Sequence, residues 1–244
     1  MEHILLNDDC LDAMKDLSDN SIDLLFCDLP YGQTDCKWDS LINLELFWLQ
    51  INRICKITCP MFFTCTTKFG VSLINSNPKN FRYELIWIKS ASCGFLNAKK
   101  MPMRKHEMIY VFYRKLPLYN IDSHKNMFLS EQALTYSKED SVYGKKTVYN
   151  YKKKNGNSVY DPPLPNSLLE IKSEKGKHST QKPVELMKWI LKYYSKENDT
   201  ILDPTMGSGS TGVACSEMNR KFIGIEKDIE IYKVALERNK VNFL

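Results

Sequence analysis

The stretch LDPTMGSGSTG, residues 202–212, decides how this chain folds. It continues a short apolar run, TILD, that is typical of a strand, and it leads into STGVACSEMN, which has the composition of a helix. Gly207, Gly209 and Gly212 follow the pattern GxGxxG, and the next apolar run, KFIGIE, ends on Glu226. A strand, a glycine-rich turn, a helix and a second strand in this order predict a unit of an open α/β sheet.

The glycine turn suits a nucleoside ligand. Glycines permit a tight turn in which backbone N–H groups at a helix N-terminus face the ligand, and Glu226 stands where an acid can bind ribose hydroxyls. Asp203-Pro204 is not what a dinucleotide turn requires. A carboxylate there instead suits a ligand with a cationic amino group, such as the methionine part of S-adenosylmethionine. The alternative is a loop that leads into a helix and binds nothing.

The same alternation of strands and helices extends over most of the chain. Apolar runs rich in β-branched and aromatic residues predict strands, four of them with the pattern of parallel strands covered on both faces. The predicted strands are residues 22–27, 61–66, 83–89, 107–113, 200–203 and 221–226. Apolar residues at helical spacing predict helices over 40–56, 68–77, 183–194, 210–219 and 229–239. We therefore expect a mostly parallel central sheet with helices on both faces.

Composition excludes several classes of protein. The chain has 244 residues, 43% hydrophobic and 26% charged, as is ordinary for a soluble globular protein. Its eight cysteines form no CxxC pair, and Cys55 and Cys59 lack partners at zinc-ligand spacing, so neither a disulfide framework nor a metal site is expected. No stretch has the length of a transmembrane helix, and the N-terminus is not a signal peptide. We expect a soluble cytoplasmic protein without a membrane partner.

The excess positive charge is confined to the middle of the chain. Residues 114–177 hold 12 Lys and Arg against 7 Asp and Glu, a difference of +5 that equals the net charge of the whole chain. This segment is polar, interrupts the strand–helix pattern and contains several tyrosines. We interpret it as an insertion with a basic surface that suits an anionic polymer, although a solvated lysine-rich loop is an equal alternative for any single residue.

A second motif, DLPYG, follows the predicted strand at 22–27. Taken alone, Asp28 caps a turn, and Pro-Tyr-Gly is ordinary turn chemistry. The chemical alternative is a seat for a planar amino group, in which Asp28 and the carbonyl of Leu29 accept its two hydrogens and Tyr31 stacks on the ring. Pro30 would stiffen this turn.

Three motifs together make the chain resemble a known family. Asp28-Leu29-Pro30-Tyr31 resembles the (D/N/S)PP(Y/F) signature of amino-directed DNA methyltransferases, residues 202–212 resemble their cofactor motif, and HSTQKP (178–183) resembles the HxTQKP element before it. Their order is that of the permuted β group. The resemblance covers residues 4–113 and 178–239, and it departs from the family at Leu29 and Ser179.

The resemblance implies a fold, a cofactor and a set of site residues. It implies the Rossmann-like S-adenosylmethionine-dependent methyltransferase fold, with a catalytic domain over 1–113 and 178–244 and a target-recognition insertion over 114–177. The implied catalytic residues are Asp28, Leu29, Pro30 and Tyr31. The implied residues for S-adenosylmethionine, whose product is S-adenosylhomocysteine, are Asp9, Asp28, Thr180, Lys182, Asp203, Pro204, Gly207, Ser208, Gly209 and Glu226. Helix capping is the alternative role of Asp9.

The implied reaction is methyl transfer to N6 of an adenine flipped out of double-stranded DNA, with no covalent enzyme intermediate. Aspartate at position 28 favours adenine N6 over cytosine N4. The candidate DNA contacts are Lys99, Lys100, Arg104, Lys145, Lys146, Lys152, Lys153 and Lys154, with residues 90–107 closing over the flipped base. A homodimer and a cognate restriction endonuclease are candidate partners. The alternatives are a cytosine N4 enzyme, an RNA adenine methyltransferase, a nucleotide-dependent oxidoreductase and a non-catalytic DNA-binding relative.

Overall fold

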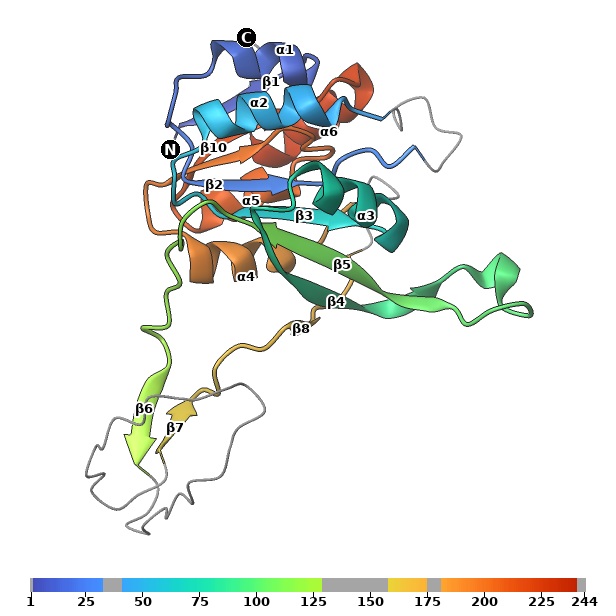
Figure 1. The fold of residues 1–244 in the computed structure, drawn as a ribbon, viewed down its shortest axis with the longest axis vertical. Coiled ribbons are helices and arrows are strands. Elements are labelled where there is room, and N and C mark those ends of the chain that lie inside the picture. The colour runs from blue at the N-terminus through green and yellow to red at the C-terminus, as the bar shows by residue number, and fades with distance from the viewer. Residues whose placement is uncertain (1, 33–40, 129–157, 175–180, 241–244) are drawn as a thin grey trace. The chain divides into compact units, whose positions relative to one another are not determined.

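The structure is a computed structural model of the chain (Figure 1). It describes residues 2–32, 41–128, 158–174 and 181–240. The chain divides into two compact units, Met1–Asn120 with Ser167–Leu244 and Ile121–Asn166.

The described part of the larger unit is built on an eight-stranded sheet with the order β1-β10-β9-β2-β3-β5-β4-β8. The strands are β1 (His3–Leu6), β2 (Leu24–Cys27), β3 (Met61–Cys65), β4 (Phe81–Cys93), β5 (Arg104–Phe112), β8 (Leu168–Glu170), β9 (Thr200–Asp203) and β10 (Lys221–Ile225). β5 is antiparallel to both β3 and β4, and the other neighbouring strands pair in parallel. The predicted mostly parallel sheet is confirmed.

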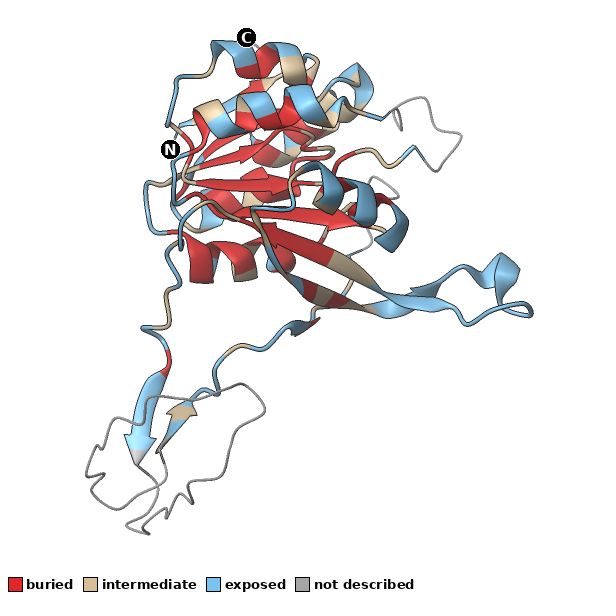
Figure 2. Cartoon of the chain, in the orientation of Figure 1, coloured by how far each residue is buried: buried red, intermediate tan, exposed pale blue. Residues whose placement is uncertain are grey.

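The prediction of a parallel strand at 107–113 is wrong, since β5 runs against its neighbours. Residues 94–103, which join β4 to β5, contain one short 3-10 helix, η2 (Phe95–Asn97). A parallel connection needs a crossover of about a dozen residues or more, usually a helix, so this chain turns back as a hairpin. The hairpin extends past the end of β3, and its outer part is exposed (Figures 1 and 2).

Both faces of the sheet are buried, as the apolar runs predict. Along β2, Leu24 and Phe26 pack into one core cluster, and Leu25 and Cys27 pack into the other. Successive side chains of a strand point to opposite faces, so a strand covered on both sides must be apolar throughout. Figure 2 shows this buried layer running through the middle of the unit.

Six helices and the 3-10 helix η1 (Met14–Asp16) cover these faces in the described residues. The helices are α1 (Cys10–Ala13), α2 (Leu44–Ile54), α3 (Thr67–Ser76), α4 (Val184–Tyr194), α5 (Ser210–Glu217) and α6 (Ile229–Asn239). Residues of α1, α2 and α3 belong to one core cluster, and residues of α4, α5 and α6 belong to the other. Among the described residues, no helix has the length and apolar character needed to cross a membrane.

The connections of the sheet reverse direction between β2 and β9. These two strands are parallel neighbours, yet β2 is followed along the chain by β3 on one side and β9 by β10 on the other. The crossover helices therefore leave in opposite directions and open a crevice at the carboxyl ends of the two strands. Asp28 follows β2 and Asp203 ends β9, so the two motifs meet there.

The smaller unit contains a two-stranded antiparallel sheet of β6 (Lys125–Phe128) and β7 (Ser158–Asp161). Next to it, Nδ1 of His124 lies 2.9 Å from the carbonyl oxygen of Pro162. This unit covers fewer residues, Ile121–Asn166, than the insertion expected over 114–177. At its C-terminal end the difference arises because β8 pairs with β4 and so belongs to the main sheet.

Candidate functional site

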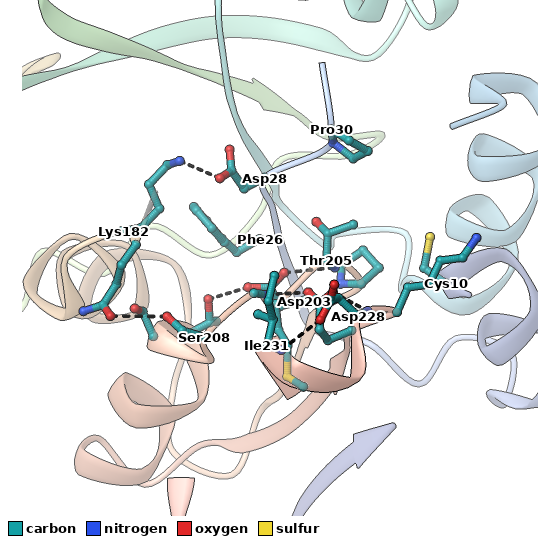
Figure 3. A pocket seen from close by; sticks show the side chains of 18 of the residues that line it. Cys10, Phe26, Asp28, Pro30, Lys182, Asp203, Thr205, Ser208, Asp228 and Ile231 are labelled. Atoms are coloured by element: carbon teal, nitrogen blue, oxygen red, sulfur yellow. Dashed lines mark hydrogen bonds and ion pairs between the residues drawn. The ribbon is translucent and has the colours of Figure 1, made fainter. Parts of the chain in front are cut away.

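A cavity of about 400 Å³ lies at the carboxyl ends of β1, β10, β9 and β2. Each of these strands is followed by, or ends on, an acid that lines the cavity: Asp9, Glu226, Asp203 and Asp28. Figure 3 shows Asp28 and Asp203 on its wall, with Lys182 reaching toward Asp28. The fold thus gathers acids from both ends of the sequence around one space.

The three glycines of the turn have different roles. Gly207 has φ +53°, and a side chain built there would meet nothing within 4 Å, so its backbone faces open space in the cavity wall. Gly209 also has a positive φ, but a Cβ there would lie 2.4 Å from Nδ2 of Asn239 in α6. A Cβ at Gly212 would lie 2.2 Å from Oδ1 of the same residue. Gly209 and Gly212 therefore allow helices to pack closely, whereas Gly207 shapes the cavity.

Asp203 is a buried carboxylate, with 2% of its surface exposed. Its Oδ2 accepts a hydrogen bond of 2.6 Å from the hydroxyl of Thr211, and its Oδ1 accepts one of 3.3 Å from the N–H of Thr205. Burial raises the pKa of Asp203 to about 7, and the nearby negative charges of Asp28 and Glu226 add to this. No cationic side chain among the described residues forms a salt bridge with Asp203, and a ligand with an ammonium group would supply this positive charge.

Glu226 ties the glycine turn to the end of β10. Its Oε2 accepts a hydrogen bond of 3.0 Å from the N–H of Gly207, and its Oε1 accepts one of 2.8 Å from the N–H of Asp228. Burial raises the pKa of Glu226. A carboxylate oxygen can accept more than one hydrogen bond, so Glu226 can hold the turn and still accept from a ligand hydroxyl.

Asp9 caps helix α1, which is the alternative role predicted for it from the sequence. Its Oδ1 accepts a hydrogen bond of 2.9 Å from the N–H of Leu11, and its Oδ2 pairs at 2.9 Å with Nζ of Lys227. Burial alone would raise the pKa of Asp9, but Lys227 and the N–H of Leu11 hold it below its ordinary value. Asp9 also lines the cavity, so capping does not exclude contact with a ligand.

Asp28 is held by three side chains. Its Oδ1 accepts from the hydroxyl of Tyr31 at 2.7 Å and from the hydroxyl of Thr64. Its Oδ2 lies 2.5 Å from Nζ of Lys182, which in turn lies 3.2 Å from Oε1 of Glu107. The orientation of the Asp28 carboxylate is therefore fixed from the side of β3 and from the segment before α4.

The rest of the DLPYG turn is divided between core and cavity. Leu29 is 2% exposed and belongs to the core cluster under α2, which accounts for an apolar side chain where the family signature has proline. Pro30 lines the cavity. The ring of Tyr31 packs 5.4 Å from that of Phe69, centroid to centroid. Burial, together with the charges of Asp28 and Glu107, raises the pKa of Tyr31.

Most of the residues expected at the cofactor site meet at the cavity. Its lining includes Asp9, Asp28, Lys182, Asp203, Pro204, Gly207, Ser208 and Glu226. Gly209 does not line the cavity and instead packs against Asn239 of α6. Among the expected DNA contacts, Lys99, Lys100 and Arg104 are exposed on the β4–β5 hairpin, away from the cavity wall. Thr180, Lys145, Lys146, Lys152, Lys153 and Lys154 lie outside the described residues.

Several site residues escaped sequence reasoning. Gln181 lines the cavity, and its Oε1 accepts a hydrogen bond of 3.3 Å from the hydroxyl of Ser208. Thr64 and Glu107 bind the groups around Asp28 but come from strands that the sequence shows only as apolar runs. The one available signal was Glu107 itself, a lone acid at the start of EMIYVFY.

Comparison with known proteins identifies the family of the chain. The family model for DNA methylases matches residues 22–237. The type II methyltransferase M.HinfI of Haemophilus influenzae is 28% identical over 255 residues, covering 96% of this chain and 67% of the relative. The DNA adenine methyltransferase YhdJ of Escherichia coli K12 is 28% identical over 244 residues, covering 96% of this chain and 81% of the relative.

Solved structures share the fold. The M1.HpyAVI–SAM complex superposes with a TM-score of 0.63 at 22% identity, covering 97% of this chain and 99% of that one. The cytosine-N4-specific PvuII DNA methyltransferase superposes with a TM-score of 0.70 at 14% identity, covering 98% and 86%. Because the family match extends over most of the 244 residues and contains both strand-end motifs, the chain belongs to the DNA methylase family.

Proposed function

We propose that the protein is an S-adenosylmethionine-dependent DNA methyltransferase that methylates N6 of adenine at specific sites in double-stranded DNA. The observation that carries the proposal is the oriented Asp28 carboxylate on the wall of the strand-end cavity. Family membership supports methyl transfer to an exocyclic amino group of DNA. Adenine is the favoured base because position 28 is aspartate and because the relative YhdJ is named a DNA adenine methyltransferase.

The cavity has the groups that S-adenosylmethionine requires. Asp203 is a buried carboxylate that no cationic side chain pairs with in the described part of the chain, so it complements the ammonium group of the methionine part. Gly207 leaves space beside its backbone, and Glu226 has acceptor capacity for ribose hydroxyls. When bound, the cofactor supplies an electrophilic methyl group on a sulfonium, and S-adenosylhomocysteine is the product. Asp203, Gly207 and Glu226 would hold it.

The hydrogen bonds of Asp28 leave one place for a substrate. An ionised carboxylate has about four lone-pair positions. The hydroxyls of Tyr31 and Thr64 occupy those of Oδ1, and Lys182 occupies one of Oδ2. The remaining position on Oδ2 can accept one hydrogen of the adenine amino group, and the carbonyl of Leu29 can accept the other.

These two acceptors activate the amino group by orientation. The lone pair of the amino nitrogen is delocalised into the adenine ring, and hydrogen bonds from both N–H groups draw the nitrogen toward a tetrahedral, nucleophilic geometry. The chain forms no covalent bond to the base, and the amino proton displaced by the new N–C bond would leave through its hydrogen bond to the Asp28 carboxylate, as or after the methyl group is transferred. Catalysis then rests on positioning and on the fixed charge of Asp28. Because N6 is paired in duplex DNA, the adenine must be flipped out to reach Asp28.

The proposed DNA contacts lie on the β4–β5 hairpin and in the insertion. Lys99, Lys100 and Arg104 are exposed near the hairpin tip, together with the apolar side chains of Phe95 and Leu96. Cationic side chains beside exposed apolar ones suit phosphates and unstacked bases. The insertion 114–177 is proposed as the target-recognition segment because the net positive charge of the chain is concentrated there.

Partners and location follow from the substrate. A cognate restriction endonuclease is proposed because the relative M.HinfI is named a type II methyltransferase. A homodimer is proposed from the resemblance to the permuted β group, and light scattering after size-exclusion chromatography measures it. DNA as substrate implies a cytoplasmic location.

The test is methyl transfer by the purified protein from labelled S-adenosylmethionine to duplex DNA, with RNA of the same sequence in parallel. Mass spectrometry of the released nucleosides should show N6-methyladenine from DNA and no N4-methylcytosine. Asp28→Ala should abolish the product, whereas Glu197→Ala, an exposed acid between α4 and β9, should leave it unchanged. Product formed only on RNA, or full activity of Asp28→Ala, would overturn the proposal.

A further inference from the structure

Asp28 stands at one end of a chain of four charged side chains. Oδ2 of Asp28 lies 2.5 Å from Nζ of Lys182, the same ammonium lies 3.2 Å from Oε1 of Glu107, and Oε2 of Glu107 lies 2.6 Å from Nζ of Lys89. We infer that Glu107 is a positioning residue, which holds the Lys182 ammonium against Asp28 and so fixes the carboxylate that receives the substrate amino group. The inference rests on the proposed function.

The network is shielded from water over most of its length. The exposed fractions of the side chains are 10% for Glu107, 11% for Lys182 and 16% for Lys89, against 26% for Asp28 beside the cavity. Burial opposes the negative charge of Glu107, yet Lys182 and Lys89 hold the pKa of Glu107 below its ordinary value. Likewise, Asp28 and Glu107 raise the pKa of Lys182 against the effect of burial. Glu107 and Lys182 are therefore held in their charged forms as a pair.

Stability alone does not account for this arrangement. The free-energy cost of taking charges out of water is about as large as the gain from their attraction. Well-packed apolar residues at these positions of β5 would therefore stabilise the fold equally well. The neighbours of Glu107 further along β5 are apolar: Ile109, Val111 and Phe112 are fully buried. An acid in this strand that pairs with Lys182 indicates a role in the site.

Glu107 restricts a side chain that is otherwise mobile. Lysine carries its charge on a flexible four-carbon stem, and one carboxylate alone does not define where the ammonium lies. Two carboxylates on opposite sides do define it, and Lys89 holds the second oxygen of Glu107 in turn. Without Glu107, Asp28 would be the one carboxylate paired with Lys182 among the described residues. The Lys182 ammonium would then shift along Asp28, and the remaining acceptor position on Oδ2 would no longer have a fixed direction.

Single-turnover kinetics test this role. With saturating S-adenosylmethionine and adenine-containing duplex DNA, Glu107→Gln should slow methyl transfer by about ten- to a hundredfold, the usual loss when a reacting group is misplaced by a fraction of an ångström to one ångström. Calorimetry should find affinity for S-adenosylmethionine within about twofold of wild type, because Glu107 does not line the cavity. Glu84→Gln, an exposed acid on the same hairpin, is the matched control and should leave the rate unchanged.

A double-mutant cycle separates positioning from a structural role. If Glu107 acts through Lys182, then in the Lys182→Met background the change Glu107→Gln should slow transfer by less than about twofold. An equal loss in both backgrounds, or a wild-type rate for Glu107→Gln alone, would overturn the inference. Should Glu107→Gln not fold, Glu107→Asp tests the same point, since it keeps the charge but withdraws it by one methylene, and its rate should also fall.

Nuclear magnetic resonance gives a readout that does not depend on activity. In the protein labelled at lysine Nζ, the buried Lys182 ammonium should exchange its protons slowly with water, and this signal should disappear in Lys182→Met and in Glu107→Gln. A signal that persists in Glu107→Gln overturns the inference. A wild-type protein that transfers no methyl group to adenine but shows this signal refutes the proposed function and leaves the ion network established.

Discussion

Replacing Asp203 by asparagine should make the ligand-free protein more stable at alkaline pH while removing its affinity for S-adenosylmethionine. Asp203 is 2% exposed, and burial raises its pKa from an ordinary 3.8 to about 7. Above that pH the folded protein carries a buried charge whose cationic partner is a ligand group. Asparagine has nearly the same shape without the charge. The variant should therefore have a larger free energy of unfolding and a lower affinity for S-adenosylmethionine.

The magnitude follows from the shift. A pKa raised by about three units in the folded state lowers the free energy of unfolding by about 4 kcal/mol once pH exceeds both values. This loss develops between about pH 4 and pH 7, since over that range the folded state binds more protons than the unfolded state. Asparagine has one acceptor oxygen for the two donors, Thr211 and Thr205, which costs about 1 kcal/mol. The expected net gain is about 3 kcal/mol at pH 8.

Urea unfolding of both proteins between pH 5 and pH 8, without ligand, measures this difference. The two should differ by less than about 1 kcal/mol at pH 5 and by about 3 kcal/mol at pH 8, where calorimetry should find no tight S-adenosylmethionine binding by the variant. Asp16→Asn, an exposed position, is the control and should leave the pH dependence unchanged. A difference that is constant over this range would contradict a raised pKa at Asp203, and tight S-adenosylmethionine binding by the variant would contradict pairing of Asp203 with the ligand ammonium.

Three further changes test other parts of the structure. Gly212→Ala should lower the free energy of unfolding in urea by about 2 kcal/mol, because the new methyl group would overlap buried Asn239; an unchanged midpoint contradicts this packing. Replacing Lys99 and Lys100 together by alanine should reduce the slope of log DNA affinity against log salt concentration by about two, as measured by fluorescence anisotropy; an unchanged slope excludes phosphate contacts there. Tyr31→Phe should slow single-turnover transfer by about tenfold, the value of one hydrogen bond to a charged group, and equal rates would show that the hydroxyl is dispensable.

Local patterns were sufficient to predict most of the regular structure. The strands β2, β3, β9 and β10 and the helices α2, α3, α4, α5 and α6 lie within a few residues of their predicted positions. Their signals are local, since an apolar run covered on both faces or an apolar stripe at helical spacing is visible within a dozen residues. β1 and β8 escaped notice because they are short strands at the two edges of the sheet, each with one buried residue, and so lack the continuously buried apolar run of the inner strands.

Some residues of the candidate site were also predictable from local sequence patterns, and others were not. Asp28, Asp203 and Glu226 were predictable because each follows or ends a strand and belongs to a motif of turn residues. Glu107 was not, because nothing near it in the sequence shows which charge it meets. Lys182 was expected beside the cofactor, and the structure places its ammonium on Asp28, 154 residues away along the chain.

The type of most elements, the glycine turn and the two motifs can be predicted from the sequence, since they depend on backbone preferences and on side chains a few residues apart. The tertiary structure alone decided the direction of β5, the meeting of β2 with β9 at one crevice and the ion network behind Asp28. Strand order and charge pairing depend on contacts between residues far apart in the chain, and such contacts are selected by burial and shape in the folded protein. Taken alone, the DLPYG stretch is therefore predicted only as a turn, and in the folded protein its residues Asp28 and Pro30 line the cavity.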